Sequence, residues 1–214
     1  MNQERMNSKV ETTRIKLFWK WFEDNEARIR DLLDNDSSGD RAAFIQAMDN
    51  QILEFGMFTW EIGHGSNKPF FLTISPNGNW ERMELSRLIM KSAPNLADWE
   101  FNYAQPLKDW DLTFRLFDNH MIERTLDASG WKFVAERLSG NKVKITIEAG
   151  NIAGLDFDTQ LAAGNLVITN MLGEECKINH VDKIEMVSEF DPQQKASASP
   201  ILSLKQRFDE MVRY

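Results

Sequence analysis

Cysteine is almost absent from this chain of 214 residues, which contains only Cys176. A single thiol cannot close an internal disulfide, so the fold must rely on its hydrophobic core, as is usual in a reducing compartment. No apolar run approaches the roughly 18 residues that a membrane-spanning helix needs, and the hydrophilic start MNQERMNSKVETTR does not resemble a signal peptide. We therefore expect a soluble, cytoplasmic protein.

Basic residues are also in deficit: 25 lysines and arginines face 33 aspartates and glutamates, for a formal net charge of -8. Phosphate backbones and anionic lipid surfaces bind proteins largely through Lys and Arg, so nucleic acid and membrane are not expected partners. An acidic surface attracts basic partners instead, mainly by raising the rate of association. Hydrophobic residues make up 42% of the chain, which is enough for a packed globular core.

The sequence contains none of the familiar catalytic or cofactor-binding patterns. There is no G-x-S-x-G, no Walker phosphate loop, no G-x-G-x-x-G after a strand, no H-E-x-x-H and no paired C-x-x-C. The segment DNDSSGD at 34–40 resembles a calcium loop but lacks the glutamate that would close it. With three histidines in the chain, acid–base chemistry would depend on carboxylates. We therefore expect no cofactor and no metal.

The strongest amphipathic pattern is IKLFWKWFEDNEARIRDLL, in which apolar residues from Ile15 to Leu33 recur at helical spacing. Glu26 falls within this apolar stripe and Asn25 at its edge. A carboxylate there needs a partner or a raised pKa, because burying a bare charge is costly. A structural bond from Glu26 to an arginine or a backbone amide is one interpretation, and a functional acid is the other. Trp21 lies off the stripe, where it covers a second element or forms an exposed patch.

The remaining pattern alternates between helices and strands. Helices are expected after Asp40, at 80–92 and at 201–214, and strands in two hairpins (MFTWEI with FFLTIS, and WKFVAERLSGNKVKITIE) and in WEFNYAQ, LTFRLF and DKIEMV. Residues 158–172 are ambiguous, because NLVIT has strand propensity. Asp158 could instead cap a helix that ends at Gly173, which we favour. These features predict a single α+β domain with helices packed on a mainly antiparallel sheet built from hairpins.

We expect four regions along the chain. Residues 1–13 form a flexible N-terminus, 14–188 the α+β domain, 189–200 a polar linker with two prolines, and 201–214 a tethered amphipathic helix. No internal sequence repeat is visible. The last helix can dock on its own domain or on a second copy of the chain, and the second arrangement would make a homo-oligomer.

The only cysteine lies in MLGEECKINH, four residues before His180. If residues 174–180 are helical, the two side chains share a face and could form a thiolate–imidazole pair. Nearby carboxylates disfavour a thiolate, and in a connection between a helix and the strand DKIEMV the spacing guarantees no contact. The carboxylates around His180 could also supply metal ligands, but their spacing matches no known metal-binding pattern.

Three segments, FWKWFEDNE, KSAPNLADWEF and NLVITNMLGEE, together resemble a family of uncharacterised bacterial proteins. The family pattern is an F-W-x-W-F opening helix, an alanine–proline step before a tryptophan-containing strand, and a late L-G-E motif. The similarity spans roughly residues 15–187. The family has no assigned activity, so the resemblance implies a bacterial, cytoplasmic protein and a helix before Gly173, and it implies no reaction.

The resemblance also bears on the candidate residues. The matching polar positions are Asn25, Glu26 and Glu174, whereas Cys176 and His180 are not part of the pattern. We therefore interpret MLGEECKINH as a helix C-terminus followed by a polar connection, with Glu174 as the residue of interest.

The leading functional hypothesis is a non-catalytic protein-binding domain, of the adaptor or immunity kind, whose acidic surface engages another protein. Seven tryptophans suit such a surface, because tryptophan is enriched at interface hot spots. The alternative is a small-molecule hydrolase that uses Glu26 and Glu174 with His180, which a pocket gathering them would favour. A flat acidic face with an exposed Trp21 would favour the leading hypothesis. The candidate binding residues are Asn25, Glu26, Trp21, Glu174 and His180.

Overall fold

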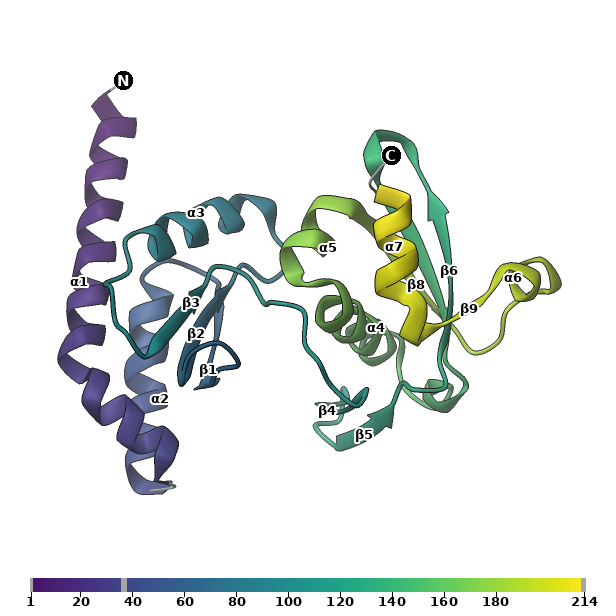
Figure 1. Ribbon diagram of the computed structural model, residues 1–214, viewed down its shortest axis with the longest axis horizontal. Helices are drawn as coiled ribbons and strands as arrows, with labels where there is room; N and C mark the ends of the chain where they lie inside the picture. Colours follow the sequence, from purple (N-terminus) through teal and green to yellow (C-terminus); the bar gives the residue numbers. More distant parts are fainter. Residues whose placement is uncertain (1, 36–37, 213–214) are drawn as a thin grey trace. The chain divides into compact units, whose positions relative to one another are not determined.

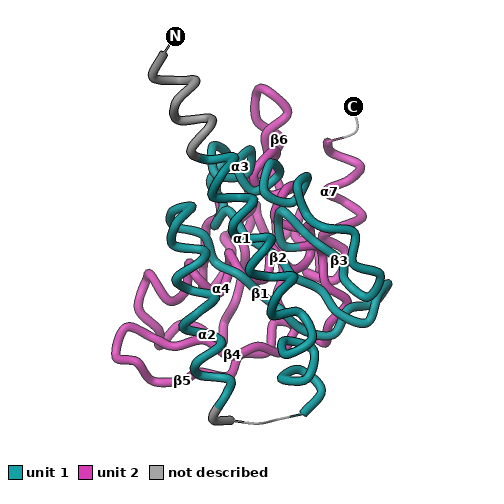
Figure 2. Tube along the Cα trace, turned by 90° about the vertical axis from the view of Figure 1, so that its left-hand side faces the viewer, with its two compact units in different colours: residues 1–105 teal, residues 106–214 magenta. Residues whose placement is uncertain are grey.

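The structure is a computed structural model that describes residues 2–35 and 38–212, with side chains from residue 11 onward except at Ser38 and Gly39. It confirms the α+β class with mostly antiparallel strand pairs. The chain forms two compact units, Met1–Gln105 and Pro106–Tyr214 (Figure 2). A single domain over 14–188 was expected. The division is physical, because each unit buries a hydrophobic core of its own.

Unit 1, residues 1–105, combines helices with a three-stranded sheet (Figure 1). Its elements are α1 (Asn2–Asp34), α2 (Ser38–Leu53), β1 (Thr59–His64), β2 (Phe70–Ser75), α3 (Trp80–Lys91) and β3 (Trp99–Asn102). The central strand β2 pairs antiparallel with β1 and parallel with β3. The expected hairpin is therefore confirmed, and the third strand returns beside it after the crossover helix α3.

Helix α1 buries the stripe that its sequence predicted. Phe18, Phe22 and Ile29 are fully buried, together with Leu72 and Ile74 of β2. A flexible N-terminus was expected at 1–13, and in the structure the backbone of α1 is helical from Asn2. The first 14 residues contain neither glycine nor proline, the two residues that most oppose a helix.

Unit 2, residues 106–214, contains a two-stranded and a four-stranded sheet. Its elements are β4 (Thr113–Phe117), β5 (Glu123–Asp127), β6 (Lys132–Arg137), β7 (Val143–Glu148), α4 (Phe157–Leu172), α5 (Glu174–His180), β8 (Val181–Val187), α6 (Pro192–Ser197), β9 (Ser199–Pro200) and α7 (Leu204–Val212). The larger sheet has the order β8-β7-β6-β9, with β8 parallel to β7. Strand β5 was not expected, because only Leu126 of its five residues is buried and its sequence is mostly polar.

Helix α4 confirms the helical interpretation of 158–172. Its N-cap is Asp156 rather than Asp158: the Asp156 carboxylate accepts a hydrogen bond from the Thr159 amide at 3.0 Å. The helix ends at Gly173, whose φ of +82° lies in the region that favours glycine. Residues 174–180 then form α5, where a polar connection was expected. Acidic residues in its first turn and basic ones in its last complement the helix dipole.

The polar linker expected at 189–200 is also more ordered than its composition indicated. Helix α6 begins with a capping box, in which Asp191 and Gln194 each bond the other's backbone amide. Strand β9 then pairs antiparallel with β6. This segment is therefore part of unit 2.

The C-terminal helix docks on its own unit. Ile201, Leu204 and Phe208 are fully buried in the core of unit 2, and Met211 and Val212 pack against that core. The apolar stripe that would have joined two copies of the chain is therefore covered within one copy.

Candidate functional site

Glu26 is a structural residue of unit 1. One oxygen of its carboxylate, Oε1, accepts a hydrogen bond from the indole Nε1 of Trp99 at 2.7 Å, and Oε2 accepts one from Arg30 Nη2 at 3.1 Å. The bond to Trp99 ties α1 to β3, and the bond to Arg30 follows the expected pairing with an arginine. Both carboxylate oxygens are thus engaged in contacts that hold the fold.

Asn25 and Trp21 also serve helix α1. The Asn25 side chain donates a hydrogen bond to the backbone carbonyl of Trp21 at 2.8 Å. Trp21 is half-buried and stacks on Phe18 with a centroid distance of 6.4 Å. Trp21 therefore packs on the core of unit 1 and does not form an exposed patch.

Glu174 lies at the start of α5 with 3% of its surface exposed. Three residues later, the ammonium of Lys177 donates a hydrogen bond to the Thr169 hydroxyl at 3.0 Å. Burial lowers the pKa of Lys177, and the charge of Glu174 opposes that shift. Glu174 thus offsets part of the effect of burying Lys177 beside the junction of α4 and α5, which is a structural role.

Cys176 and His180 lie on one helix, yet they are not an activated pair. Burial raises the pKa of the Cys176 thiol, and Lys205 only partly opposes the shift, so the thiolate is disfavoured. The His180 ring faces other groups: its Nδ1 lies 3.3 Å from the Asn141 carbonyl oxygen, and its centroid lies 6.5 Å from that of Phe208. The cysteine packs against the core of unit 2 as a small apolar residue.

The hydrolase hypothesis required Glu26, Glu174 and His180 in one pocket. Glu26 belongs to unit 1 and the other two to unit 2. Within α5 the positions of Glu174 and His180 differ by six residues, about 9 Å along the axis and on different faces. Among the described side chains, no group of three or more His, Cys, Asp or Glu residues could hold a metal ion.

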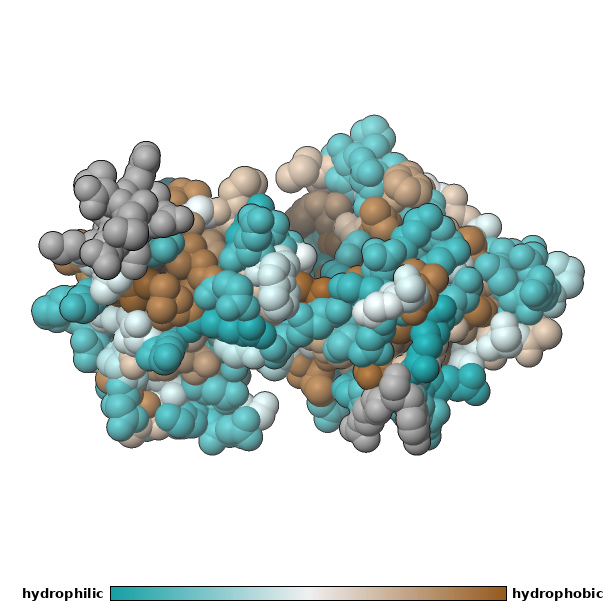
Figure 3. All heavy atoms as spheres, turned by 90° about the horizontal axis from the view of Figure 1, so that it is seen from above, coloured by the Kyte–Doolittle hydropathy of each residue, from teal (hydrophilic) through white to brown (hydrophobic). Residues whose placement is uncertain are grey.

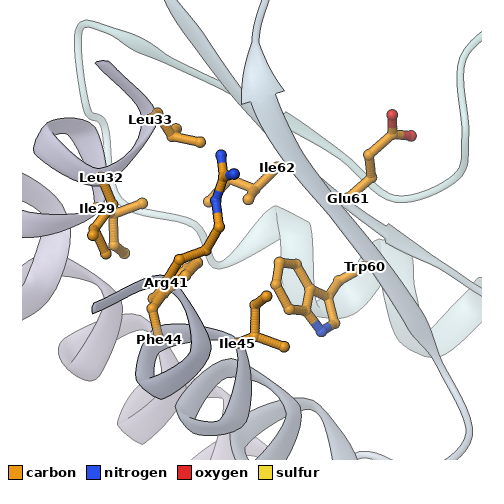
Figure 4. Close-up of a pocket in the computed structure, with 9 residues that line it drawn as sticks. All are labelled: Ile29, Leu32, Leu33, Arg41, Phe44, Ile45, Trp60, Glu61 and Ile62. Carbon is orange, nitrogen blue, oxygen red and sulfur yellow. The ribbon is translucent and has the colours of Figure 1, made fainter. Parts of the chain in front are cut away.

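Unit 1 contains an apolar pocket of about 300 Å³ between α1, α2 and β1 (Figure 4). It is lined by Ile29, Leu32, Leu33, Arg41, Phe44, Ile45, Trp60, Glu61 and Ile62. Seven of these nine residues are apolar, so the pocket suits an apolar group. None of the five candidate residues lines it.

Unit 2 presents a cluster of apolar side chains to solvent where β4 turns into β5. Four large residues are exposed there: Phe117 (59%), Met121 (77%), Ile122 (49%) and, at the start of α4, Phe157 (73%). The Asn119 amide donates a hydrogen bond to Asp156 Oδ2 at 3.5 Å, which places the start of α4 beside the turn. We call Phe117, Met121, Ile122 and Phe157 the tip patch.

The turn of the tip patch is held by one buried carboxylate. Asp118 accepts hydrogen bonds from the amides of His120 (2.9 Å) and Ile122 (3.0 Å) and from Arg124 Nε (2.8 Å). The Ile122 amide, followed by Arg124 and His120, holds the pKa of Asp118 below its ordinary value. Met121 has a φ of +59°, in the left-handed position that glycine usually fills in such a loop.

Single exposed apolar residues are ordinary on protein surfaces, and apolar atoms reach the surface over both units (Figure 3). The tip patch differs because three of its four members lie in the six-residue segment 117–122, which forms one turn held by Asp118. The sequence contained one signal for it, the apolar pair Met121–Ile122 directly after the polar run DNH. Periodicity could not identify it, because a turn has none.

The chain matches no protein-family model, and the comparisons with curated proteins and with solved structures gave no match. The resemblance to uncharacterised bacterial proteins therefore stays a prediction. In the part of the chain that the structure describes, no helix has the length and hydropathy needed to cross a membrane.

Proposed function

We propose that this protein is a non-catalytic protein-binding module of the adaptor or immunity kind, and that the tip patch of unit 2 is its docking surface. The observation that carries the proposal is the exposure of four large apolar side chains around one turn. Clustered apolar residues on a surface mark interaction sites more often than isolated ones do. The turn is fixed by Asp118 before any partner arrives, so little conformational entropy is lost on binding.

The charges around the tip patch indicate the chemistry of the partner. Asp156 and Asp158 flank Phe157 in the sequence. Glu123 follows Ile122 and pairs with Arg115 at 3.2 Å. The surroundings are thus acidic on balance, as the whole chain is. They favour a partner segment that combines apolar anchors with lysine or arginine.

Site-specific photo-crosslinking tests the proposal. A benzoylphenylalanine placed at Met121 should crosslink to one protein in cells that make this chain naturally. The same probe at Leu202, which is equally apolar and 68% exposed on unit 2, should not. Equal crosslinking from both positions, or none from Met121, would contradict the proposed surface.

A second variant separates binding from folding. Met121→Gly removes the anchor and relieves the left-handed backbone, so the free energy of unfolding should rise by about 1 kcal/mol while partner binding is lost. Urea unfolding and the affinity for the crosslinked partner measure the two effects. A variant that is more stable and still binds fully would exclude Met121 from the interface.

A further inference from the structure

Met121 is the most exposed methionine that the structure describes. Its residue surface is 77% exposed, and among the methionines with described side chains only Met57, at 73%, is comparable. Met48 and Met83 are fully buried, and the others are half-buried. Peroxides oxidise a thioether to a sulfoxide, and the reagent has to reach the sulfur. Oxidation is therefore favoured at Met121 and Met57.

The backbone at Met121 is held by contacts that do not involve its side chain. The Met121 amide donates a hydrogen bond to the Asp118 carbonyl oxygen at 2.9 Å. The amides on either side, of His120 and Ile122, donate to Asp118 Oδ1 at 2.9 and 3.0 Å. A chemical change at the end of the Met121 side chain therefore alters the tip patch and leaves the turn intact.

We propose that Met121 is a reversible oxidation site, and that its sulfoxide form weakens binding of a protein partner at the tip patch. The inference rests on the proposed function, because it concerns regulation of the same surface. A lone pair of Met121 Sδ takes one oxygen atom from hydrogen peroxide, the O–O bond breaks, and water leaves. The sulfur is oxidised and the peroxide is reduced. Methionine sulfoxide reductases reverse the step with two thiols, which form a disulfide while the oxygen leaves as water.

The sulfoxide weakens binding because the tip patch is apolar. The side chains of the other members, Phe117, Ile122 and Phe157, have no hydrogen-bond donor for the new oxygen. An interface that covers Met121 has to bury this polar group, and burial of an unpaired polar group lowers affinity by about tenfold or more.

Peptide mass spectrometry of the full chain treated with hydrogen peroxide tests the site itself. Met121 and Met57 should be oxidised before Met48 and Met83, and methionine sulfoxide reductases A and B should remove the oxygen from Met121. Circular dichroism should show that the fold persists. Three results would overturn the proposal: oxidation of Met121 no faster than that of Met83, oxidation that the reductases do not reverse, or loss of the fold when Met121 is oxidised.

The effect on binding is measured with a benzoylphenylalanine probe at Phe157, which leaves Met121 in place. The purified chain, before and after peroxide treatment, is photo-crosslinked in lysate of cells that make it naturally. Its affinity, read from the adduct yield at increasing concentrations of the chain, should fall about tenfold on oxidation and recover after reductase treatment. An unchanged affinity would overturn the regulation alone, whereas the absence of any adduct before oxidation would overturn the docking surface as well.

Two matched variants assign the effect to Met121, and each is compared with its own unoxidised form. Met57→Leu removes the other exposed thioether, which lies in unit 1, and should show the same loss of affinity on oxidation as the original chain. Met121→Leu has no thioether in the tip patch, so peroxide should leave its affinity at the starting value. A loss on oxidation that persists in Met121→Leu, or that disappears in Met57→Leu, would overturn the assignment.

Discussion

Unit 1 and unit 2 share the same order of secondary-structure elements, but the residues of their cores differ. Each contains an antiparallel hairpin, a helical crossover and a third strand that runs parallel to the second strand of the hairpin: β1-β2-α3-β3 in one, β6-β7-α4-α5-β8 in the other. No internal sequence repeat indicates this shared topology. Strand order is therefore compatible with two quite different core compositions.

The core of unit 1 is dense in aromatic rings. Phe22 lies edge-on to Trp99 at a centroid distance of 4.9 Å and to Phe101 at 5.7 Å. Tryptophans also make polar contacts there: the Trp19 indole donates to the Ile89 carbonyl at 2.8 Å. A buried tryptophan needs a hydrogen-bond acceptor for its indole N–H. Glu26 accepts the bond from Trp99, which explains why an acid lies inside the apolar stripe of α1.

The four-stranded sheet of unit 2 has an aliphatic face and a charged face. Ile145 and Ile147 of β7 are fully buried on one face. On the other face, Lys144 of β7 forms an ion pair with Glu185 of β8, with 2.8 Å between Lys144 Nζ and Glu185 Oε2. Lys183 pairs with the same glutamate at 2.6 Å. Alternation along the strands separates these two faces.

The largest expected effect tests whether the two cores are independent. Phe22→Ala in unit 1 and Phe208→Ala in unit 2 each remove a fully buried ring, which costs about 3–5 kcal/mol of the free energy of unfolding. Amide hydrogen exchange read by mass spectrometry should show lost protection in residues 1–105 for the first variant and in 106–214 for the second. Loss of protection throughout the chain in either variant would mean a single cooperative unit.

A smaller effect concerns the close approach of α4 to the sheet. A Cβ added at Gly164 would collide with Met186 Sδ and come within 3.4 Å of Ile184 Cγ2. Gly164→Ala should therefore lower the free energy of unfolding by about 1–2 kcal/mol, even though alanine favours a helix. Met186→Ala in the same chain should recover part of the loss in a double-mutant cycle, and strictly additive losses would show that the two residues do not meet.

The smallest effect is the acid response of the charged face of unit 2. Hydrogen bonds from Lys144 and Lys183 lower the pKa of Glu185 to about 2, from an ordinary value of 4.5. The stabilisation is present above the ordinary value and is lost as pH falls through the folded-state value. Glu185→Gln should flatten this pH dependence, which we expect to be worth less than about 1 kcal/mol because the ion pairs of Glu185 are partly exposed to solvent. The measurement is urea unfolding followed by the amide resonances of β7 and β8 at several pH values between 4.5 and 2. If the unfolding midpoint of Glu185→Gln depends on pH as steeply as that of the unmodified protein, the role given to Glu185 is contradicted.

Local pattern was sufficient for much of the fold. The stripe of α1, both hairpins and the helix before Gly173 follow from side-chain periodicity and from capping or breaking residues. One of the two interpretations of Glu26 was a structural bond to an arginine or a backbone amide, and Arg30 on the same helix provides such a bond. Its second partner, Trp99, is 73 residues away, and no local rule identifies it.

The candidate binding surfaces were not accessible to the same reasoning. The tip patch depends on which apolar residues remain uncovered after packing, and the pocket of unit 1 depends on the space between three elements. Glu174 was selected for its position in a motif, and the structure places it in a buried contact region instead. Candidate residues chosen by type or spacing can thus be structural. The proposed docking surface consists instead of the exposed apolar residues of the tip patch.

The sequence by itself determined the α+β class, the helical face of α1 and the alternation of the hairpin strands, because each depends on residues a few positions apart. Only the tertiary structure decided that the chain divides into two cores, that residues 189–200 join unit 2, and that the last helix covers its own unit. Those outcomes depend on which apolar faces meet across long sequence separations, where burial of shared surface, and not local periodicity, selects the arrangement.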